Sequence, residues 1–210
     1  MTDRYVMLGA GGHARALQET LALQGTALHG FIAPTAESTL QGVAWLGTDA
    51  ALAELDTSSV LLVNGIGSVR SPRLRREIYL AATTAGFRFA SVIDDRAIVR
   101  SSAQLAAGVQ ILAGAVVNSD SSVGANSIVN SLALVEHGCV IGAHVHIASA
   151  AALAGDVVVG DETHIGLGAR VVQGISVGSQ CTIGAGAVVT RDVENGSIAV
   201  GVPATSRPAR

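Results

Sequence analysis

The chain of 210 residues has no lysine, two cysteines, four prolines and few aromatic residues. Thirteen arginines against sixteen acidic residues give a net charge of −3, so neither a basic field for nucleic acid nor an acidic tail is expected. No apolar run approaches the roughly 20 residues of a membrane span. The start, MTDRYVMLGAGG, does not follow the pattern of a signal peptide. These absences predict a cytoplasmic protein with no nucleic-acid partner and no membrane association.

Aromatic residues make up 3% of the chain, whereas hydrophobic residues make up 49%. The core must therefore consist of Val, Ile, Leu and Ala, which suits thin stacked layers. The two cysteines, Cys139 and Cys181, fall on the same small position of the repeat described next, and this indicates two buried, reduced thiols.

A six-residue repeat runs from Ile93 to Val189 without a miss or an insertion. A fixed short period of this kind is typical of a solenoid, whereas an amphipathic helix would show spacings of three and four. With three hexads to a coil, residues 18 apart should stack in neighbouring coils, roughly 4.8 Å from each other. The aliphatic positions are Ile93, Val99, Leu105, Ile111, Val117, Val123, Val129, Val135, Ile141, Ile147, Leu153, Val159, Ile165, Val171, Val177, Ile183 and Val189.

Residues 1–90 do not carry the period and predict a small α/β domain with a parallel sheet, because strands alternate with helices. Strands are expected at 5–8, 28–32 and 59–63, and a short helix capped by Thr48 and Asp49 runs through Leu55. Helices are expected at 14–24, with Gly25 as the stop, and from Ser71-Pro72 onward. Three residues, Leu74, Ile78 and Ala82, are predicted to form the inner face of that second helix. Residues 91–190 are then the solenoid, and 191–210 are a C-terminal tail lying over the last coil.

The glycine loop at residues 9–14, GAGGHA, follows a predicted strand and opens a predicted helix. In this context glycines let a backbone approach a phosphate at the helix N-terminus. The acid that a bound NAD requires about 20 residues further on is missing, because the second strand ends in Phe31-Ile32-Ala33-Pro34. Redox work with NAD is therefore rejected. A nucleotide or phosphate held by backbone groups and a tight turn without a ligand both stay open.

Columns of residues 18 apart bring polar side chains together on two or three adjacent coils. Asp120, Gly138 and Asp156 form one column, and His137 is next to it. His146 and His164 form another column, and both are expected to point outward. Four of the six histidines lie within 28 residues, and a cluster beside stacked acids is where a general base is expected. The set is Asn118, Asp120, Asn130, Glu136, His137, His144, His146, Asp156 and His164.

The repeat resembles the hexapeptide-repeat acyltransferases, which fold as left-handed parallel β-helices and work as homotrimers. The whole chain more closely resembles the sialic acid O-acetyltransferase family, including N-acetyltransferases of nucleotide-linked 4-amino-sugars. The expected fold is a Rossmann-like N-terminal α/β domain followed by a left-handed parallel β-helix. The resemblance implies acetyl-CoA as co-substrate, a sugar acceptor and no metal. It rests on GAGGHA (9–14), NGIGSVRSPRLRREIY (64–79), NSLALVEHGCVIGAHVHIA (130–148) and GVPA (201–204).

The resemblance also implies roles for single residues. His137 matches the family's catalytic base, and His146 matches a histidine near the acetyl group of acetyl-CoA. Further cofactor contacts, in a cleft between subunits, fall at Gly155, Leu167, Ser176 and Ala185. The nucleotide end of the substrate falls at Gly11, Gly12, His13, Gly67 and Ser68.

The chain departs from the family pattern at two places. The family has an acid directly after the base histidine, where this chain has Gly138. The stacked acids Asp120 and Asp156, or Glu136, are the candidates to orient His137 instead. The family's acidic pair at the end of the second strand is Ala33-Pro34 here.

The sequence supports an acetyl-CoA-dependent transferase acting on a sugar amine, with His137 as base. One alternative is O-acetylation of a sugar or sialic acid. A second is a zinc enzyme like the γ-class carbonic anhydrases, with His146 and His164 as ligands. A third is an inactive binding protein, which the glycine at position 138 favours.

Overall fold

The computed structural model describes residues 4–37, 40–68 and 71–209 and divides the chain into two compact units, Met1–Val92 and Ile93–Arg210. The division falls two residues beyond the boundary expected from the sequence. The segment predicted as a tail is part of the second unit. Each unit is described by itself.

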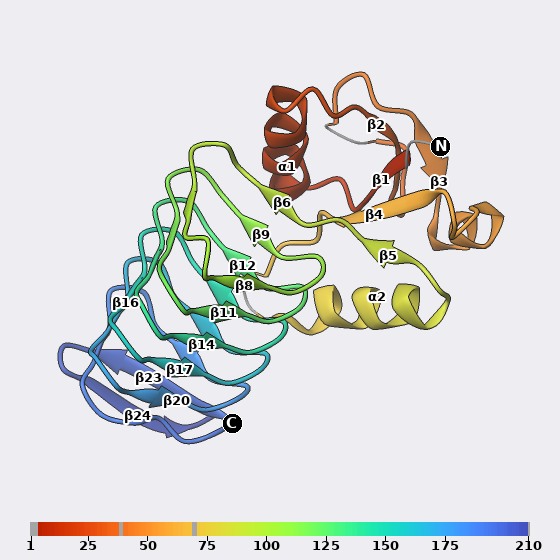
Figure 1. The fold of residues 1–210 in the computed structure, drawn as a ribbon. Helices are drawn as coiled ribbons and strands as arrows, with labels where there is room; N and C mark the ends of the chain where they lie inside the picture. Colours follow the sequence, from red (N-terminus) through yellow and green to blue (C-terminus); the bar gives the residue numbers. More distant parts are fainter. Residues whose placement is uncertain (1–3, 38–39, 69–70, 210) are drawn as a thin grey trace. The chain divides into compact units, whose positions relative to one another are not determined.

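The first unit is a five-stranded parallel sheet with strand order β3-β2-β1-β4-β5 (Figure 1). This confirms the predicted α/β domain, and β3 is a strand that the sequence pattern did not indicate. The strands are β1 Arg4–Leu8, β2 Leu28–Ile32, β3 Trp45–Gly47, β4 Val60–Asn64 and β5 Arg88–Phe89. The helices are α1 Gly12–Leu23, the 3₁₀ helix η1 Asp49–Glu54 and α2 Arg73–Thr84.

The strand order reverses its direction between β1 and β4. The connection from β1 to β2 through α1 steps one way across the sheet, and that from β4 to β5 through α2 steps the other way. Because crossovers between parallel strands are right-handed, α1 and α2 cover opposite faces, and η1, between β3 and β4, shares the face of α2. Such a reversal opens a crevice at the carboxyl ends of the strands.

The expected first helix is confirmed, and Ala14, Leu17 and Leu21 are among the residues of its buried face. Gly25 follows the helix with a φ of +69°, a left-handed conformation that suits glycine at a helix end. At the start of α2, the Ser71 hydroxyl accepts a hydrogen bond from the Arg73 amide at 3.1 Å, but the N-cap residue is Pro72, one position later than the serine expected from the sequence.

The predicted inner face of α2 is partly wrong. Leu74 is 57% exposed, whereas Arg75, Tyr79 and Ala82 are the buried residues of this helix. The physical reason is that Leu74 and Ile78 line a cavity instead of entering the core.

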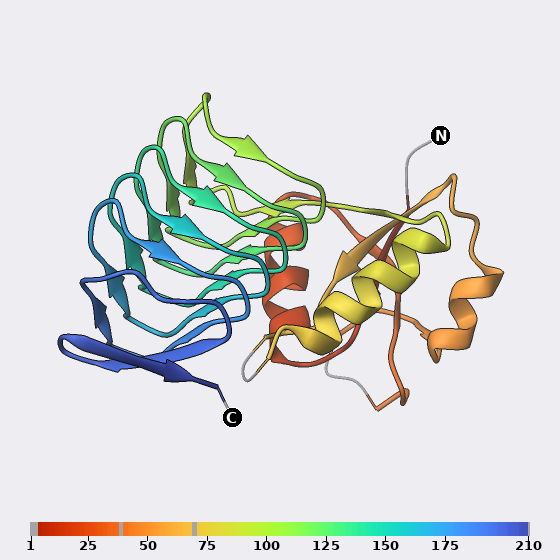
Figure 2. The ribbon, with the colours of Figure 1, turned by 90° about the horizontal axis from the view of Figure 1, so that it is seen from below.

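The second unit is a parallel β-helix, whose coils stack along its axis from green to blue in Figures 1 and 2. Every aliphatic residue of the six-residue series is the second residue of a two-residue strand, so the predicted solenoid is confirmed. The strands are β6 Val92–Ile93, β7 Ile98–Val99, β8 Gln104–Leu105, β9 Gln110–Ile111, β10 Val116–Val117, β11 Ser122–Val123, β12 Ile128–Val129, β13 Leu134–Val135, β14 Val140–Ile141, β15 His146–Ile147, β16 Ala152–Leu153, β17 Val158–Val159, β18 His164–Ile165, β19 Arg170–Val171, β20 Ser176–Val177, β21 Thr182–Ile183 and β22 Val188–Val189.

Residues 18 apart pair side by side, as Val117 does with Val135, and this builds three flat faces. The first face is β7-β10-β13-β16-β19-β22, the second is β8-β11-β14-β17-β20, and the third begins with β6-β9-β12-β15-β18-β21. The aliphatic side chains point inward and form one continuous core. Small inward residues complete it, and the hydroxyl of Ser121 donates to the Glu136 carbonyl at 2.6 Å inside the coil.

The end of the chain is a β-hairpin and not a tail draped over the last coil. β23 Ser197–Gly201 pairs in parallel with β21, and β24 Ala204–Pro208 pairs antiparallel with β23 (Figure 1). The hairpin therefore continues the third face beyond the last regular hexad.

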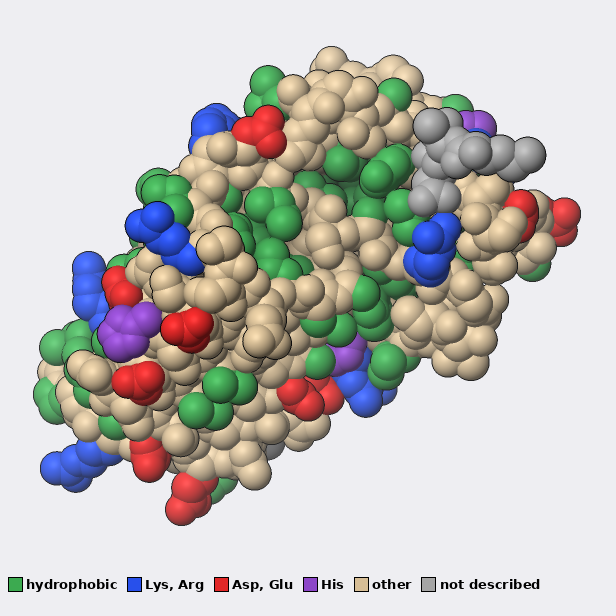
Figure 3. Space-filling view, viewed as in Figure 1, with side chains coloured by type: hydrophobic (Ala, Val, Ile, Leu, Met, Phe, Trp, Pro, Cys, Tyr) green, Lys and Arg blue, Asp and Glu red, His purple; other side chains and the backbone are tan. Residues whose placement is uncertain are grey.

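In the described ranges, no helix is long and apolar enough to cross a membrane. On the side drawn in Figure 3, acidic, basic and histidine side chains are interspersed over the surface.

Candidate functional site

Each coil turns from the first face to the second through a corner, and the predicted catalytic residues lie there. We call residues 118–121, 136–139, 154–157 and 172–175 the His137 corner. It brings together Glu136, His137, Asp120 and Asp156, on three consecutive coils, as the column arithmetic predicted. It also contains Gly155, which was assigned to the cofactor by resemblance alone.

The imidazole of His137 lies directly against Gly155 of the next coil. A Cβ atom built on Gly155 would lie 2.5 Å from Cε1 and 2.7 Å from Nε2 of the ring, which is closer than van der Waals contact permits. Glycine at this position therefore makes room for the ring. The two residues are 18 apart, so the column spacing could have revealed this contact from the sequence.

The carboxylate of Asp156 fills the space that a side chain at position 138 would occupy. A Cβ atom built on Gly138 would collide with Asp156 Oδ1, and Gly138 has a φ of +67°. The Asp156 amide also donates to the carbonyl of His137 at 2.9 Å. An acid from the neighbouring coil thus stands where the family pattern has an acid on the residue after the histidine.

The other two acids are held differently. Glu136 Oε2 accepts a hydrogen bond from the backbone amide of His137 at 3.2 Å, so this carboxylate holds the backbone and not the ring. The backbone amide of Asp120 donates a hydrogen bond to the Ser102 hydroxyl oxygen at 3.0 Å, one coil further back. Within the described part of the chain, no carboxylate forms a hydrogen bond with the ring of His137, whose side chain is exposed.

His146 lies on the third face, opposite the His137 corner, and it is buried rather than open to solvent, with 8% of its surface exposed. Its Nε2 atom is 3.0 Å from the Asn130 amide nitrogen. The Asn130 Oδ1 atom already accepts the Ser131 amide at 2.8 Å, which fixes the amide orientation. Asn130 therefore donates to Nε2, and the neutral ring of His146 carries its proton on Nδ1. Asn130 belongs to the polar set predicted from the sequence, but its hydrogen bond to His146 is not part of that prediction.

His164 pairs with His146 across neighbouring coils, as the 18-residue spacing predicted. The two rings meet edge to face with centroids 4.9 Å apart. Burial lowers the pKa of His164 below its usual value, because burial disfavours the charged ring. Because Nε2 of His146 is hydrogen-bonded to Asn130, His146 and His164 do not point two ring nitrogens at a shared metal ion. Among the residues that the structure describes, no three His, Cys, Asp or Glu side chains are grouped as metal ligands.

The residues expected to contact the cofactor fall on two sides of the β-helix. Gly155 is in the His137 corner, and Ser176 begins β20 on the adjoining second face. In contrast, Leu167 and Ala185 are exposed in the corner between the third and first faces, which we call the Leu167 corner (residues 130–133, 148–151, 166–169 and 184–187). One chain therefore does not bring the two sets together.

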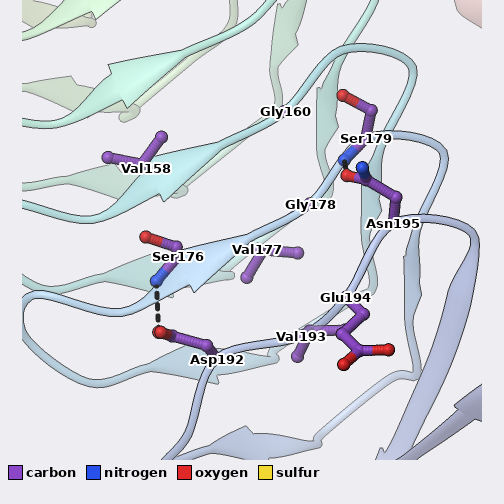
Figure 4. A pocket seen from close by; sticks show the side chains of 10 residues that line it. All are labelled: Val158, Gly160, Ser176, Val177, Gly178, Ser179, Asp192, Val193, Glu194 and Asn195. Atoms are coloured by element: carbon purple, nitrogen blue, oxygen red, sulfur yellow. Dashed lines mark hydrogen bonds between the residues drawn. The ribbon is translucent and has the colours of Figure 1, made fainter.

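Ser176 lines an open groove of about 630 Å³ on the second face (Figure 4). Its amide donates to Asp192 Oδ1 at 2.8 Å, and the Ser179 amide donates to Asn195 Oδ1 at 2.7 Å. Asp192 replaces the carbonyl that a further coil would supply, whereas Asn195 binds the Ser179 amide as Asp161 binds the Ala143 amide in an earlier coil. Because Asp192 and Glu194 line one end, the groove fits an uncharged stretch of a ligand better than a phosphate.

In the first unit, Gly11 caps α1 without a side-chain hydrogen bond, and Gly12 is the first helical residue. A Cβ atom on Gly67 would lie 3.5 Å from the Cβ of His13, so the loop after β4 and the start of α1 lie side by side. These residues, predicted to face the nucleotide, are thus close together. Ser68 is only 2% exposed, so its side chain is buried and not open to solvent.

A buried polar network, which no sequence pattern indicates, holds the loop after β4. Arg75 Nη1 donates to the carbonyls of Asn64 and Ile66, both at 2.8 Å. The Asn64 side chain in turn donates to the Arg75 carbonyl at 3.2 Å and accepts the Ile66 amide. Burial lowers the pKa of Arg75 to about 9. The network fixes the loop beside the cavity at the carboxyl ends of the strands.

A parallel α/β unit joined to a parallel β-helix with a histidine in a corner defines a hexapeptide-repeat acyltransferase. Two family models match: the PglD N-terminal domain over residues 4–82, and the hexapeptide repeat of succinyl-transferase over residues 156–191. A search of curated proteins finds no match.

Solved structures resemble the chain over its whole length. A histidine-to-asparagine variant of perosamine N-acetyltransferase from Caulobacter crescentus, in complex with CoA and GDP-perosamine, is 35% identical with a TM-score of 0.92, covering 100% of this chain and 99% of that one. The acetyltransferase domain of PglB from Neisseria gonorrhoeae FA1090, in complex with acetyl coenzyme A, is 33% identical with a TM-score of 0.92, covering 99% and 100%. The chain therefore belongs to the hexapeptide-repeat nucleotide-sugar N-acetyltransferases with a PglD-type N-terminal domain. WeeI from Acinetobacter baumannii AYE, 22% identical with a TM-score of 0.88 and covering 98% and 100%, has the same fold.

Proposed function

We propose that the protein transfers an acetyl group from acetyl-CoA to an amino group of a nucleotide-linked sugar, with His137 as the general base. The observation that carries the proposal is the exposed imidazole of His137, seated on Gly155 with the carboxylate of Asp156 beside it. The CoA and GDP-perosamine complexes of the related structures support the choice of both substrates.

The chemistry is a proton-coupled acyl transfer. The lone pair of the sugar amine attacks the thioester carbonyl carbon, and the carbonyl oxygen becomes negatively charged. His137 accepts the proton that the amine loses, which is the task of a neutral imidazole near pH 7. The tetrahedral intermediate collapses, the C–S bond breaks, and the proton passes to the departing CoA sulfur. The products are an N-acetyl sugar and free CoA thiol.

His146 is proposed to act on the acetyl group from a neighbouring subunit. Its Nδ1 carries the proton, because Asn130 donates to Nε2. An N–H donor near the thioester carbonyl would stabilise the developing negative charge. Asn130 is then a positioning residue, which holds the ring in the tautomer that has this donor.

The separation of the predicted cofactor residues supports a site shared by two subunits of a homotrimer. Gly155 and Ser176 lie on the His137 side of the β-helix, whereas Leu167 and Ala185 lie in the Leu167 corner. A rotational assembly would bring the His137 corner of one subunit against the Leu167 corner of the next. The acetyl-CoA arm would then run in the cleft between them, along the groove lined by Ser176.

The test is release of CoA thiol from acetyl-CoA with GDP-, UDP- and TDP-linked 4-amino-sugars and with free sialic acid. We expect thiol release with at least one nucleotide-linked amino-sugar and a product heavier by one acetyl group. Hydroxylamine distinguishes the bond, because an N-acetyl amide resists it and an O-acetyl ester is cleaved. A folded protein without thiol release on any acceptor would favour the binding-protein alternative, and a hydroxylamine-sensitive product would favour O-acetylation.

Subunit mixing tests the shared site. We expect His137→Ala and Leu167→Arg each to be inactive alone, since each damages one side of every cleft. In every mixed trimer one of the three clefts keeps both native sides, so the average activity of a random mixture, which includes unmixed trimers, should return to about one quarter of wild type. The control is the same mixture in which His137→Ala and Leu167→Arg are in one chain beside a wild-type chain. No recovery in trimers shown to be mixed would contradict a site shared in this way.

A further inference from the structure

The first unit contains a cavity of about 230 Å³ at the carboxyl ends of β1, β2 and β4. This is the place where the strand order reverses, and where ligands bind in open parallel sheets. The volume suits a single planar ring system and not a whole nucleotide. Its lining residues are Leu8, Gly9, Ile32, Ala33, Pro34, Asp49, Leu52, Ile66, Leu74, Ile78 and Ala81.

The wall formed by the end of β2 offers no free hydrogen-bond donor. The Ala33 amide donates to the Gly47 carbonyl at 3.2 Å, and the Ala33 carbonyl accepts the indole N–H of Trp45 at 3.1 Å. Pro34 has no N–H at all. This wall is therefore an apolar surface, rigidly held by β3, against which a flat ring can pack.

Asp49 is the charged residue among the lining residues of the cavity. It is the first residue of η1, and its side chain is exposed rather than folded back. Within the described ranges, its carboxylate has neither a hydrogen bond nor an ion pair. An ionised carboxylate only accepts hydrogen bonds and has room for two donors side by side.

We propose that this cavity binds the base of the nucleotide-linked substrate and that Asp49 selects guanine. The proposal rests on the proposed function, because it presumes a nucleotide. Guanine carries two adjacent donors, N1–H and the N2 amino group, which match the two oxygens of one carboxylate. Uracil and thymine present one N–H between two carbonyl acceptors, and adenine and cytosine present an amino group beside a ring acceptor. Each of these places an acceptor against Asp49.

The path of the remaining nucleotide follows from the same residues. Gly9 lines the cavity and is two residues before Gly11, which caps α1. A base in the cavity would direct its ribose and diphosphate along this glycine loop toward the N-terminus of α1. Phosphates are favoured there by the unpaired amides and the helix dipole. The base would then be bound by the charged side chain of Asp49, and the phosphates by backbone amides and the helix dipole.

An acid in the first turn of a helix also stabilises that helix, and this is the alternative role for Asp49. The two roles differ in their consequences. A helix-stabilising acid affects folding and treats all nucleotides alike, whereas a base-reading acid changes the ranking of nucleotides.

The experiment is calorimetric titration of the full chain with GDP, inosine diphosphate, UDP, TDP, ADP and CDP. We expect GDP to bind at least ~10-fold more tightly than the other five nucleotides, in the range of a good bidentate contact. Inosine diphosphate lacks only the N2 amino group, so this comparison tests the contact without altering the protein. In Asp49→Asn, the preference for GDP over inosine diphosphate should fall to within about threefold. The matched control is Glu54→Gln, which removes the same charge from η1 at a residue that does not line the cavity.

Three results overturn the guanine proposal alone: tighter binding of a pyrimidine nucleotide or ADP, equal binding of GDP and inosine diphosphate, or an unchanged GDP preference in Asp49→Asn. If no nucleotide binds, the proposal fails together with the nucleotide-linked part of the proposed function. Thiol release with an amino-sugar that carries no nucleotide would identify this last case.

Discussion

Both units of the chain are built on parallel strands, but they form their sites in opposite ways. In the β-helix, a coil of three two-residue strands repeats every 18 positions, so each corner residue meets its equivalent in the next coil. In the α/β unit, β1, β2 and β4 have five residues each, and the cavity arises where their connections diverge. In the β-helix, a glycine leaves a gap that a side chain of the neighbouring coil fills. The carboxylate of Asp156 fills the gap at Gly138, and the ring of His137 fills the gap at Gly155.

This contrast predicts where substitutions act, and the largest expected effect is on the core of the β-helix. Leu153 is fully buried in the stacked aliphatic core. Leu153→Ala should lower the free energy of unfolding by about 2–5 kcal/mol, because the removed side chain leaves a cavity between coils that cannot close. Urea denaturation measures the loss. The matched control is Val158→Ala on the outer side of the second face, where 42% of the side chain is exposed and the loss should be under about 1 kcal/mol. Equal losses would contradict the assigned core.

The next effect is on the seat of His137. Gly155→Val should reduce kcat by about 100-fold, because a side chain there displaces the imidazole from its position. Binding of nucleotide to the first unit should not change, which separates the two units in one experiment. In a His137→Ala background the same substitution should have no further effect on kcat. Near-wild-type turnover in Gly155→Val would mean that catalysis does not depend on the position of the His137 ring against residue 155.

A smaller effect is expected from the acid beside the histidine. Asp156→Asn should lower kcat by about 10-fold, since the carboxylate next to His137 stabilises the imidazolium that forms during transfer. Asp120→Asn, two coils before Asp156 in the same column, should stay within about twofold. Moving the acid back, by Gly138→Asp together with Asp156→Gly, should restore activity, because Asp is tolerated at a positive φ. Equal losses in the two aspartate variants would show that the column as a whole, and not Asp156, supports the base.

The smallest effect concerns His164. Burial lowers its pKa, so the unfolded chain takes up a proton at a higher pH than the folded chain does. Stability should therefore fall as the pH drops from 7 to 5 through the ordinary histidine pKa of about 6.5. Urea denaturation at both pH values measures this loss, and His164→Gln should reduce it. An identical pH dependence in the variant would remove His164 as the cause.

The same contrast explains how much could be predicted from the sequence. A period without insertions determines both the strand and its partner, so the core of the β-helix and the column of Gly138 and Asp156 followed from spacing alone. In the α/β unit, the pattern predicts the wrong buried face for α2, because periodicity does not distinguish a residue facing the core from one facing a cavity, as Leu74 shows.

Two further features could not be predicted from a local sequence pattern. The hairpin of β23 and β24 forms because the open end of the third face accepts another strand, a tertiary contact without a local signal. The role of Asn130 depends on a hydrogen bond across coils, between residues 16 apart and thus outside the 18-residue columns. The sequence predicts that Asp49 caps a helix, and its proposed role in binding a base follows only from its position in the wall of the cavity.

The most direct test of the central claim is the turnover of His137→Asn with acetyl-CoA and a nucleotide-linked amino-sugar, beside wild type. Asparagine keeps a polar side chain in the exposed corner but cannot accept the proton of the amine. We expect kcat to fall by about 10³-fold, with the KM for acetyl-CoA within about threefold and the melting temperature unchanged. A folded variant that transfers acetyl groups at the wild-type rate would contradict the account.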